Sequence, residues 1–149
     1  MIIDKYSSEI VYGGVDGLIT TFAIIAGSLG AGLSHDIILI LGFASLLADG
    51  FSMGISSYLA EKMRINKKHP QYVGLSTFIS FIVIGSLPLT PFVFNVDYAF
   101  EIAVFILAIV LFLLGYSKGQ LKEGLESLFI GGVAVVVSFY SARYIKKIM

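Results

Sequence analysis

The sequence predicts an all-α integral membrane protein with five transmembrane helices in a single domain. Its 149 residues are 57% hydrophobic and 13% charged, with a mean hydropathy of +0.92, whereas soluble domains are roughly a quarter charged. The charged residues also cluster, and they leave five long apolar stretches between them. Because a helix needs about 20 mainly apolar residues to cross a bilayer, each stretch is a candidate span.

The five spans can be placed from the apolar stretches and the breaks between them. The third carries Pro88 and Pro91, and because proline lacks a backbone N–H, we expect this helix to break near Pro88. The fourth is the most uniformly apolar, and the fifth is rich in small residues that allow close helix packing. The expected helices cover about residues 11–31, 37–60, 72–94, 98–116 and 125–144.

The distribution of basic residues predicts how the helices cross the membrane. Five crossings put the two termini on opposite sides, so that seven of the ten Lys and Arg residues share the side of the N-terminus. Four of these seven lie in the linker at 61–71. Because basic loops stay in the cytoplasm, we expect the N-terminus and this linker to be cytoplasmic and the C-terminus to lie opposite.

Two carboxylates interrupt the first two spans. Asp16 lies in the first and Asp49 in the second, where a charged group at the bilayer centre costs roughly 2.5–3.5 kcal/mol on insertion scales. Such groups usually face a protein interior or a watery path. Asp16 and Asp49 are therefore candidate functional residues.

Helical spacing shows which side chains share a face with these acids. Four polar or sulfur-containing residues of the second span recur at steps of four, four and three, and Glu61 extends the stripe toward the cytoplasm: Ser45, Asp49, Met53 and Ser56. A similar stripe of small and polar residues on the first span consists of Gly13, Asp16, Thr20, Ala23 and Gly27.

Carboxylates and a thioether together form a mixed ligand set. Oxygen ligands suit hard divalent ions, and a methionine sulfur adds preference for softer ones, so borderline ions such as ferrous iron fit best. The stripe has no histidine and the chain has no cysteine, which argues against a tight zinc site. No enzyme motif, cofactor motif or long basic tract occurs, so we expect neither an enzyme, nor a bound cofactor, nor a nucleic-acid partner.

Each of these residues also has a purely structural interpretation. Met53 can be a packing residue, and Asp16 and Asp49 can accept hydrogen bonds that fix helix association. His35 falls in the expected turn and His69 in the basic linker, where both are expected to be solvated. Acids near the start of the fifth span complement the helix dipole or collect ions at the cytoplasmic mouth: Glu123 and Glu126.

The residues around these acids resemble a known family. The stretches GGVDGLITTFAIIAG and ASLLADGFSMGISSYLAEK are similar to the first two membrane helices of the vacuolar iron transporter family. The resemblance continues through GSLPLTPFVF and GYSKGQLKEGLESLFIGGVAVVVSFYSARYI and so spans nearly the whole chain.

The resemblance implies a five-helix homodimer with an ion path at the subunit interface. It implies export of ferrous iron, and of manganese, from the cytosol in exchange for protons. By position, Asp16 and Met53 match the metal-path residues of the family, and Asp49 and Glu61 match acidic positions of its second helix. We expect the cytoplasmic membrane of a prokaryote as the location.

One departure from the family pattern leaves a second hypothesis open. Many members carry a glutamate-rich cytoplasmic domain between helices two and three, but this chain has only the short basic stretch KMRINKKHPQY there. The alternative hypothesis is a membrane scaffold or partner subunit that keeps the fold without transporting ions.

Overall fold

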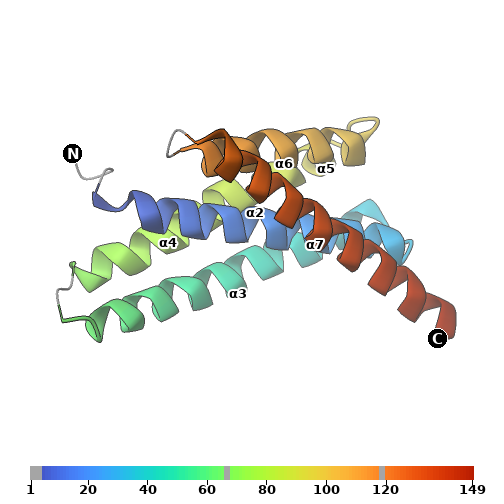
Figure 1. Cartoon of the computed structure of the whole chain (residues 1–149). Coiled ribbons are helices and arrows are strands. Elements are labelled where there is room, and N and C mark those ends of the chain that lie inside the picture. The colour runs from blue at the N-terminus through green and yellow to red at the C-terminus, as the bar shows by residue number, and fades with distance from the viewer. Residues whose placement is uncertain (1–4, 66–67, 118–119) are drawn as a thin grey trace.

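The computed structural model describes residues 5–65, 68–117 and 120–149, and within these ranges it is all-helical (Figure 1). Five of its helical segments are long and apolar enough to cross a membrane, which confirms the predicted fold class. They are α2 (Ser7–Gly30), α3 (His35–Lys62), α4 with its continuation (Pro70–Val93), α6 (Ala99–Tyr116) and α7 (Leu121–Ile148).

The third segment breaks where its prolines predict. Helix α4 itself ends at Gly85, a 3₁₀ turn, η1 (Leu87–Leu89), contains Pro88, and the short helix α5 (Thr90–Val93) carries Pro91 at its start. A proline is tolerated in the first turn of a helix because the N–H it lacks would have no partner there. The third membrane segment therefore consists of two α-helices, α4 and α5, joined by the 3₁₀ turn η1.

Several helix boundaries differ from the expectation. His35 was expected in a turn, but it is the first residue of α3, after Ser34 in an extended conformation. Asp36 in the first turn favours this start because its charge complements the helix dipole. Helix α7 begins at Leu121, before the expected residue 125, and it runs to Ile148.

Helix α2 lies at the centre of the bundle and packs against α3, α4, α6 and α7. Glycines bring it close to its neighbours: a Cβ at Gly13 would come 2.4 Å from the Thr77 carbonyl oxygen of α4. Near the other end, Ser138 of α7 donates a hydrogen bond to the Ala23 carbonyl of α2. These contacts hold α4 and α7 on different sides of α2.

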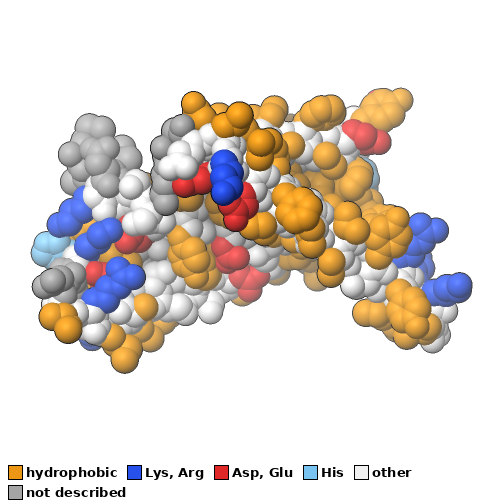
Figure 2. Space-filling view, in the orientation of Figure 1, with side chains coloured by type: hydrophobic (Ala, Val, Ile, Leu, Met, Phe, Trp, Pro, Cys, Tyr) orange, Lys and Arg blue, Asp and Glu red, His pale blue; other side chains and the backbone are white. Residues whose placement is uncertain are grey.

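The surface fits a membrane protein. Figure 2 shows apolar side chains over much of the visible face, Lys and Arg side chains at both ends, and a further basic side chain beside acidic ones near the middle. The start of α2 and the end of α7 lie at opposite ends of the bundle (Figure 1). Lys67 and Lys118, which contribute to the charge bias, lie outside the described residues, and the predicted orientation stays a prediction.

Candidate metal path

Asp16 and Asp49 lie on neighbouring helices, both half-buried. Their carboxylates are close enough for their charges to repel each other. Ser45, one turn earlier on α3, donates a hydrogen bond to Oδ2 of Asp49. The structure therefore brings together the two acids that the sequence singled out, and it gives Asp49 the serine partner that a structural role would also need.

Asp16 opens into a cavity of about 580 Å³, which we call the Asp16 cavity. Polar and apolar side chains line it, nearly all of them from the first half of α2: Ser7, Ser8, Val11, Tyr12, Val15, Asp16, Ile19 and Ser117. Thr20, on the next turn of α2, is half-buried and does not line this cavity. An acid beside a hollow of this size can meet an ion or water within the span.

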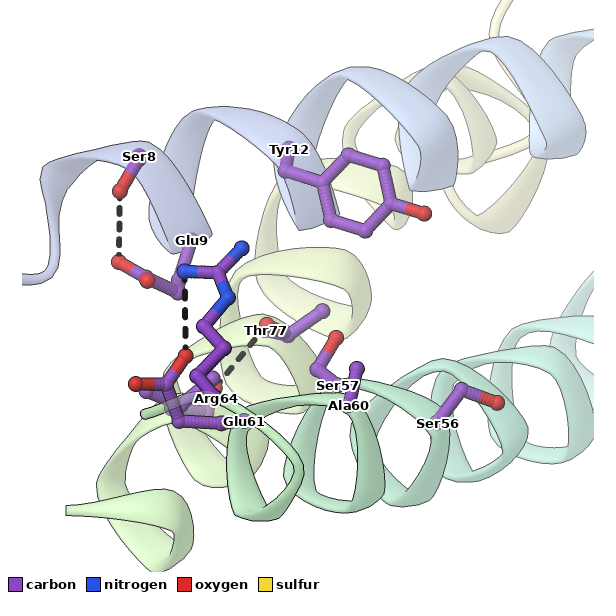
Figure 3. A pocket seen from close by; sticks show the side chains of 10 residues that line it. Ser8, Glu9, Tyr12, Ser56, Ser57, Ala60, Glu61, Arg64 and Thr77 are labelled. Carbon is purple, nitrogen blue, oxygen red and sulfur yellow. Dashed lines mark hydrogen bonds and ion pairs between the residues drawn. The ribbon is translucent and has the colours of Figure 1, made fainter. Parts of the chain in front are cut away.

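A second cavity of about 430 Å³, the Glu61 vestibule, lies between α2, α3 and α4 near the α3–α4 linker (Figure 3). It shares Ser8 and Tyr12 with the Asp16 cavity, so the two hollows adjoin. Its lining residues are Ser8, Glu9, Tyr12, Ser56, Ser57, Ala60, Glu61, Arg64, Val73 and Thr77.

Glu61 is deeply placed in this vestibule, with only 3% of its surface exposed. Its Oε1 accepts a hydrogen bond from the backbone N–H of Lys68 at 2.5 Å, and its Oε2 pairs with Arg64 at 3.2 Å. Ser56 is exposed and lines the vestibule one turn before Glu61. The expected extension of the α3 stripe to Glu61 thus ends in a cavity rather than at the free surface.

Glu9 is a second buried acid of the vestibule, and the sequence analysis missed it. It is 8% exposed and accepts hydrogen bonds from Ser8 Oγ at 2.9 Å and from Lys68 Nζ at 3.0 Å. A signal was present, because Glu9 precedes Asp16 by two helical turns and so shares its face. It was overlooked because the first span was expected to begin at residue 11, whereas α2 begins at Ser7.

Met53 packs against the hydrophobic core of the bundle. It is half-buried, one turn along α3 from Asp49, and it is not among the residues that line the Asp16 cavity or the Glu61 vestibule. This environment agrees with a packing role for Met53. A ligand role for its sulfur stays a prediction.

Glu123 and Glu126 line a smaller cavity of about 270 Å³ between α6, α7 and α2. Val11 and Ser117 belong both to this cavity and to the Asp16 cavity. Glu123 lies in the first turn of α7, as the dipole interpretation requires, while Glu126 lies one turn further along the helix. Acidic side chains therefore lie beside the Asp16 cavity on a second side.

The described residues do not form a complete metal site on their own. Among them, no three Asp, Glu, His or Cys side chains converge as ligands of one ion. The two histidines contact aromatic rings instead: His35 lies edge-on to Phe92 at 5.2 Å and His69 edge-on to Tyr72 at 5.9 Å, measured between ring centroids.

The family model described as the VIT family matches this chain over residues 7–66 and 61–143. Relatives named vacuolar iron transporter include one from Toxoplasma gondii, 47% identical over 55 residues, and one from Plasmodium berghei, 39% identical over 65 residues. Vacuolar iron transporter 1 of Arabidopsis thaliana is 44% identical over 54 residues. No solved structure matches the chain.

These matches are partial on both sides. They cover 37%, 43% and 36% of this chain and only 18%, 24% and 22% of the respective relatives. These relatives are named as transporters, not as enzymes, in agreement with the expectation that the chain is not an enzyme. Because the family model matches most of the chain, the chain belongs to the VIT family.

Proposed function

We propose that this protein transports a divalent transition-metal ion, ferrous iron in the first place and manganese as a second candidate. One observation carries the proposal: the Glu61 vestibule and the Asp16 cavity adjoin at Ser8 and Tyr12. Buried acids thus lead from one end of the bundle to a carboxylate within the span. The names of the relatives support iron as the ion.

The proposed path follows the acids in order. An ion entering at Glu61 passes Tyr12 to reach Asp16 and Asp49, whose mutual repulsion a divalent ion would relieve. Met53, one turn from Asp49, offers its sulfur as a weak ligand that favours borderline ions. Thr20, Ser45 and Ser56 supply polar groups beside the path.

Exchange with protons follows from the chemistry of these ligands. A carboxylate must be deprotonated to bind a metal, so metal binding releases any proton that it holds. Protons returning through the same acids would then displace the ion. We assign the direction as export from the cytosol. The basic linker beside the Glu61 vestibule supports a cytoplasmic location for this entry, because basic loops favour that side.

A homodimer would complete the site. Among the described residues of one chain, no third acid converges with Asp16 and Asp49, and a two-fold partner would contribute a second copy of each. The half-buried face of α2 that bears Asp16 and Thr20 is the proposed contact. We propose the cytoplasmic membrane of a prokaryote as the location. The relatives compared above come from eukaryotes.

Two observations favour the alternative of a scaffold that does not transport. Met53 packs against the core and Asp49 is hydrogen-bonded by Ser45, as in a purely structural arrangement. The scaffold hypothesis predicts a folded dimer with no ion flux.

Flux measurements separate the two functions. Proteoliposomes that contain the full chain and an internal metal-sensitive dye are given external ferrous or manganous ion under a proton gradient. A transporter gives a gradient-dependent signal above that of protein-free liposomes. A signal equal to that of protein-free liposomes, from protein shown to be folded, would leave the scaffold as the function.

A further inference from the structure

Lys68, just before α4, reaches back to the start of α2. Its Nζ lies 3.0 Å from Oε1 and 3.2 Å from Oε2 of Glu9, and 3.4 Å from Ser8 Oγ. The same ammonium lies 5.6 Å from the centre of the Tyr6 ring, within the range of a cation–π contact. The acid at the edge of the Glu61 vestibule therefore already holds a cation that belongs to the chain.

We infer that Lys68 is a tethered cation that competes with the incoming metal ion for the carboxylate of Glu9. The inference rests on the proposed function and deepens it, because it assigns a regulator of ion entry to the Glu61 vestibule. Both oxygens of Glu9 face the ammonium. A divalent ion cannot use them until the ammonium leaves.

The geometry allows the ammonium to leave. The Lys68 side chain is 29% exposed, while that of Glu9 is 10% exposed, so the cation lies on the solvent side of the pair. Lysine carries a compact charge on a flexible stem and can turn into water without moving the backbone. The backbone N–H of Lys68 keeps its bond to Glu61 in the meantime.

Arg64 supports this interpretation, because it forms an ion pair with Glu61, the other buried acid of the vestibule. It pairs with Glu61 from the linker, and its side chain is 66% exposed. Both buried acids of the vestibule thus meet basic side chains from the stretch between α3 and α4. The basic linker, which departs from the family pattern, here supplies cations to the acids that would bind the metal.

The test compares Lys68→Met with Lys62→Met in the full chain in lipid nanodiscs, with Mn²⁺ binding measured by titration. Met keeps the length of the lysine stem and removes the charge. Lys62 is the matched control because it is exposed, with its Nζ 5.3 Å from the centre of the Tyr58 ring. If the ammonium occupies the site most of the time, its removal tightens Mn²⁺ binding about tenfold. The control changes affinity by less than about twofold, since an exposed charge is screened by salt.

A double variant separates competition from a general charge effect. If the ammonium and the metal share the Glu9 carboxylate, Lys68→Met should no longer tighten Mn²⁺ binding when it is added to Glu9→Gln, measured against Glu9→Gln alone. Lys68→Gln, which stays polar, is the second neutral variant in case Lys68→Met does not fold. Unchanged or weaker Mn²⁺ binding in folded neutral variants would overturn the inference. Failure of both neutral variants to fold would also overturn it, because Lys68 would then be a residue that the fold requires.

Flux distinguishes this inference from the proposed function. If wild-type protein transports Mn²⁺ but the neutral variants bind it no more tightly, the proposed competition by Lys68 is wrong and the proposed transport function is kept. If the variants bind Mn²⁺ more tightly but neither they nor the wild type transport it, the competition is real and the transport proposal fails.

Discussion

Gly17 of α2 lies directly against the backbone of Phe81 in α4: a Cβ at position 17 would come 2.4 Å from the Phe81 carbonyl oxygen. Contact this close between two helices is possible only because glycine has no side chain. The neighbouring residue, Asp16, is therefore fixed in its rotation about α2, and it opens into its cavity instead of toward α4.

Gly17→Ala should destabilise the bundle by about 1–3 kcal/mol, because the added methyl group forces α2 and α4 apart. The measurement is thermal or denaturant unfolding in detergent. Gly132→Ala in α7 is the matched control, since no atom of another helix, among the described residues, lies within 4 Å of a Cβ there. The control should be neutral or more stable by up to about 1 kcal/mol, since alanine favours a helix. Equal losses in both variants would contradict the close contact.

Asp16→Asn should reduce metal flux to background while the protein still folds. The amide is nearly isosteric with the carboxylate and removes a costly charge from the span. Flux into dye-loaded proteoliposomes and the melting temperature are measured on the same preparation. Asp97→Asn, in the exposed linker before α6, is the control and should transport normally. Normal flux in Asp16→Asn would leave Asp16 a structural hydrogen-bond acceptor.

Met53→Leu tests whether the sulfur binds the ion. Leucine conserves volume and apolarity, so the loss of stability should stay under about 1.5 kcal/mol even though Met53 packs against the core. Affinity should fall more for ferrous and cobaltous ion than for manganous ion. Asp49→Asn should weaken the binding of all three ions together, because every divalent ion meets the same charge. Equal losses for the three ions in Met53→Leu, or none, would make Met53 a packing residue.

Cysteine cross-linking tests the proposed dimer at α2. The chain has no cysteine of its own, so single cysteines report without background. Thr20→Cys, on the half-buried face of α2, should give disulfide-linked dimers in native membranes. Phe105→Cys, 69% exposed on α6, is the control and should stay monomeric on denaturing gels. Dimers through Phe105 but not through Thr20 would place the interface elsewhere. Position 13 is unsuitable, because a side chain there meets α4.

The close contacts of α2 also divide the small-residue stripe predicted for it. Gly13 packs against α4, and Gly27 packs against Ser138 of α7, so both serve helix packing. Asp16 and Thr20 remain half-buried between these two contacts. Periodicity grouped these residues in one stripe, but it could not distinguish a residue that lines a hollow from residues that pack against another helix.

The sequence by itself determined the properties that depend on local chemistry. Apolar length determined the five helices, and Pro88 determined the break in the third, because a missing N–H acts wherever the neighbouring helices lie. The cost of a charge in a bilayer likewise singled out Asp16 and Asp49 before any contact was known.

Only the tertiary structure decided which groups meet across helices. Glu9 and Lys68 are 59 residues apart in the chain and form an ion pair. The Glu61 vestibule takes its lining residues from α2, α3 and α4, and it shares Ser8 and Tyr12 of α2 with the Asp16 cavity. Such meetings depend on the rotation and crossing of whole helices, which many small contacts fix together and which no local pattern of residues specifies.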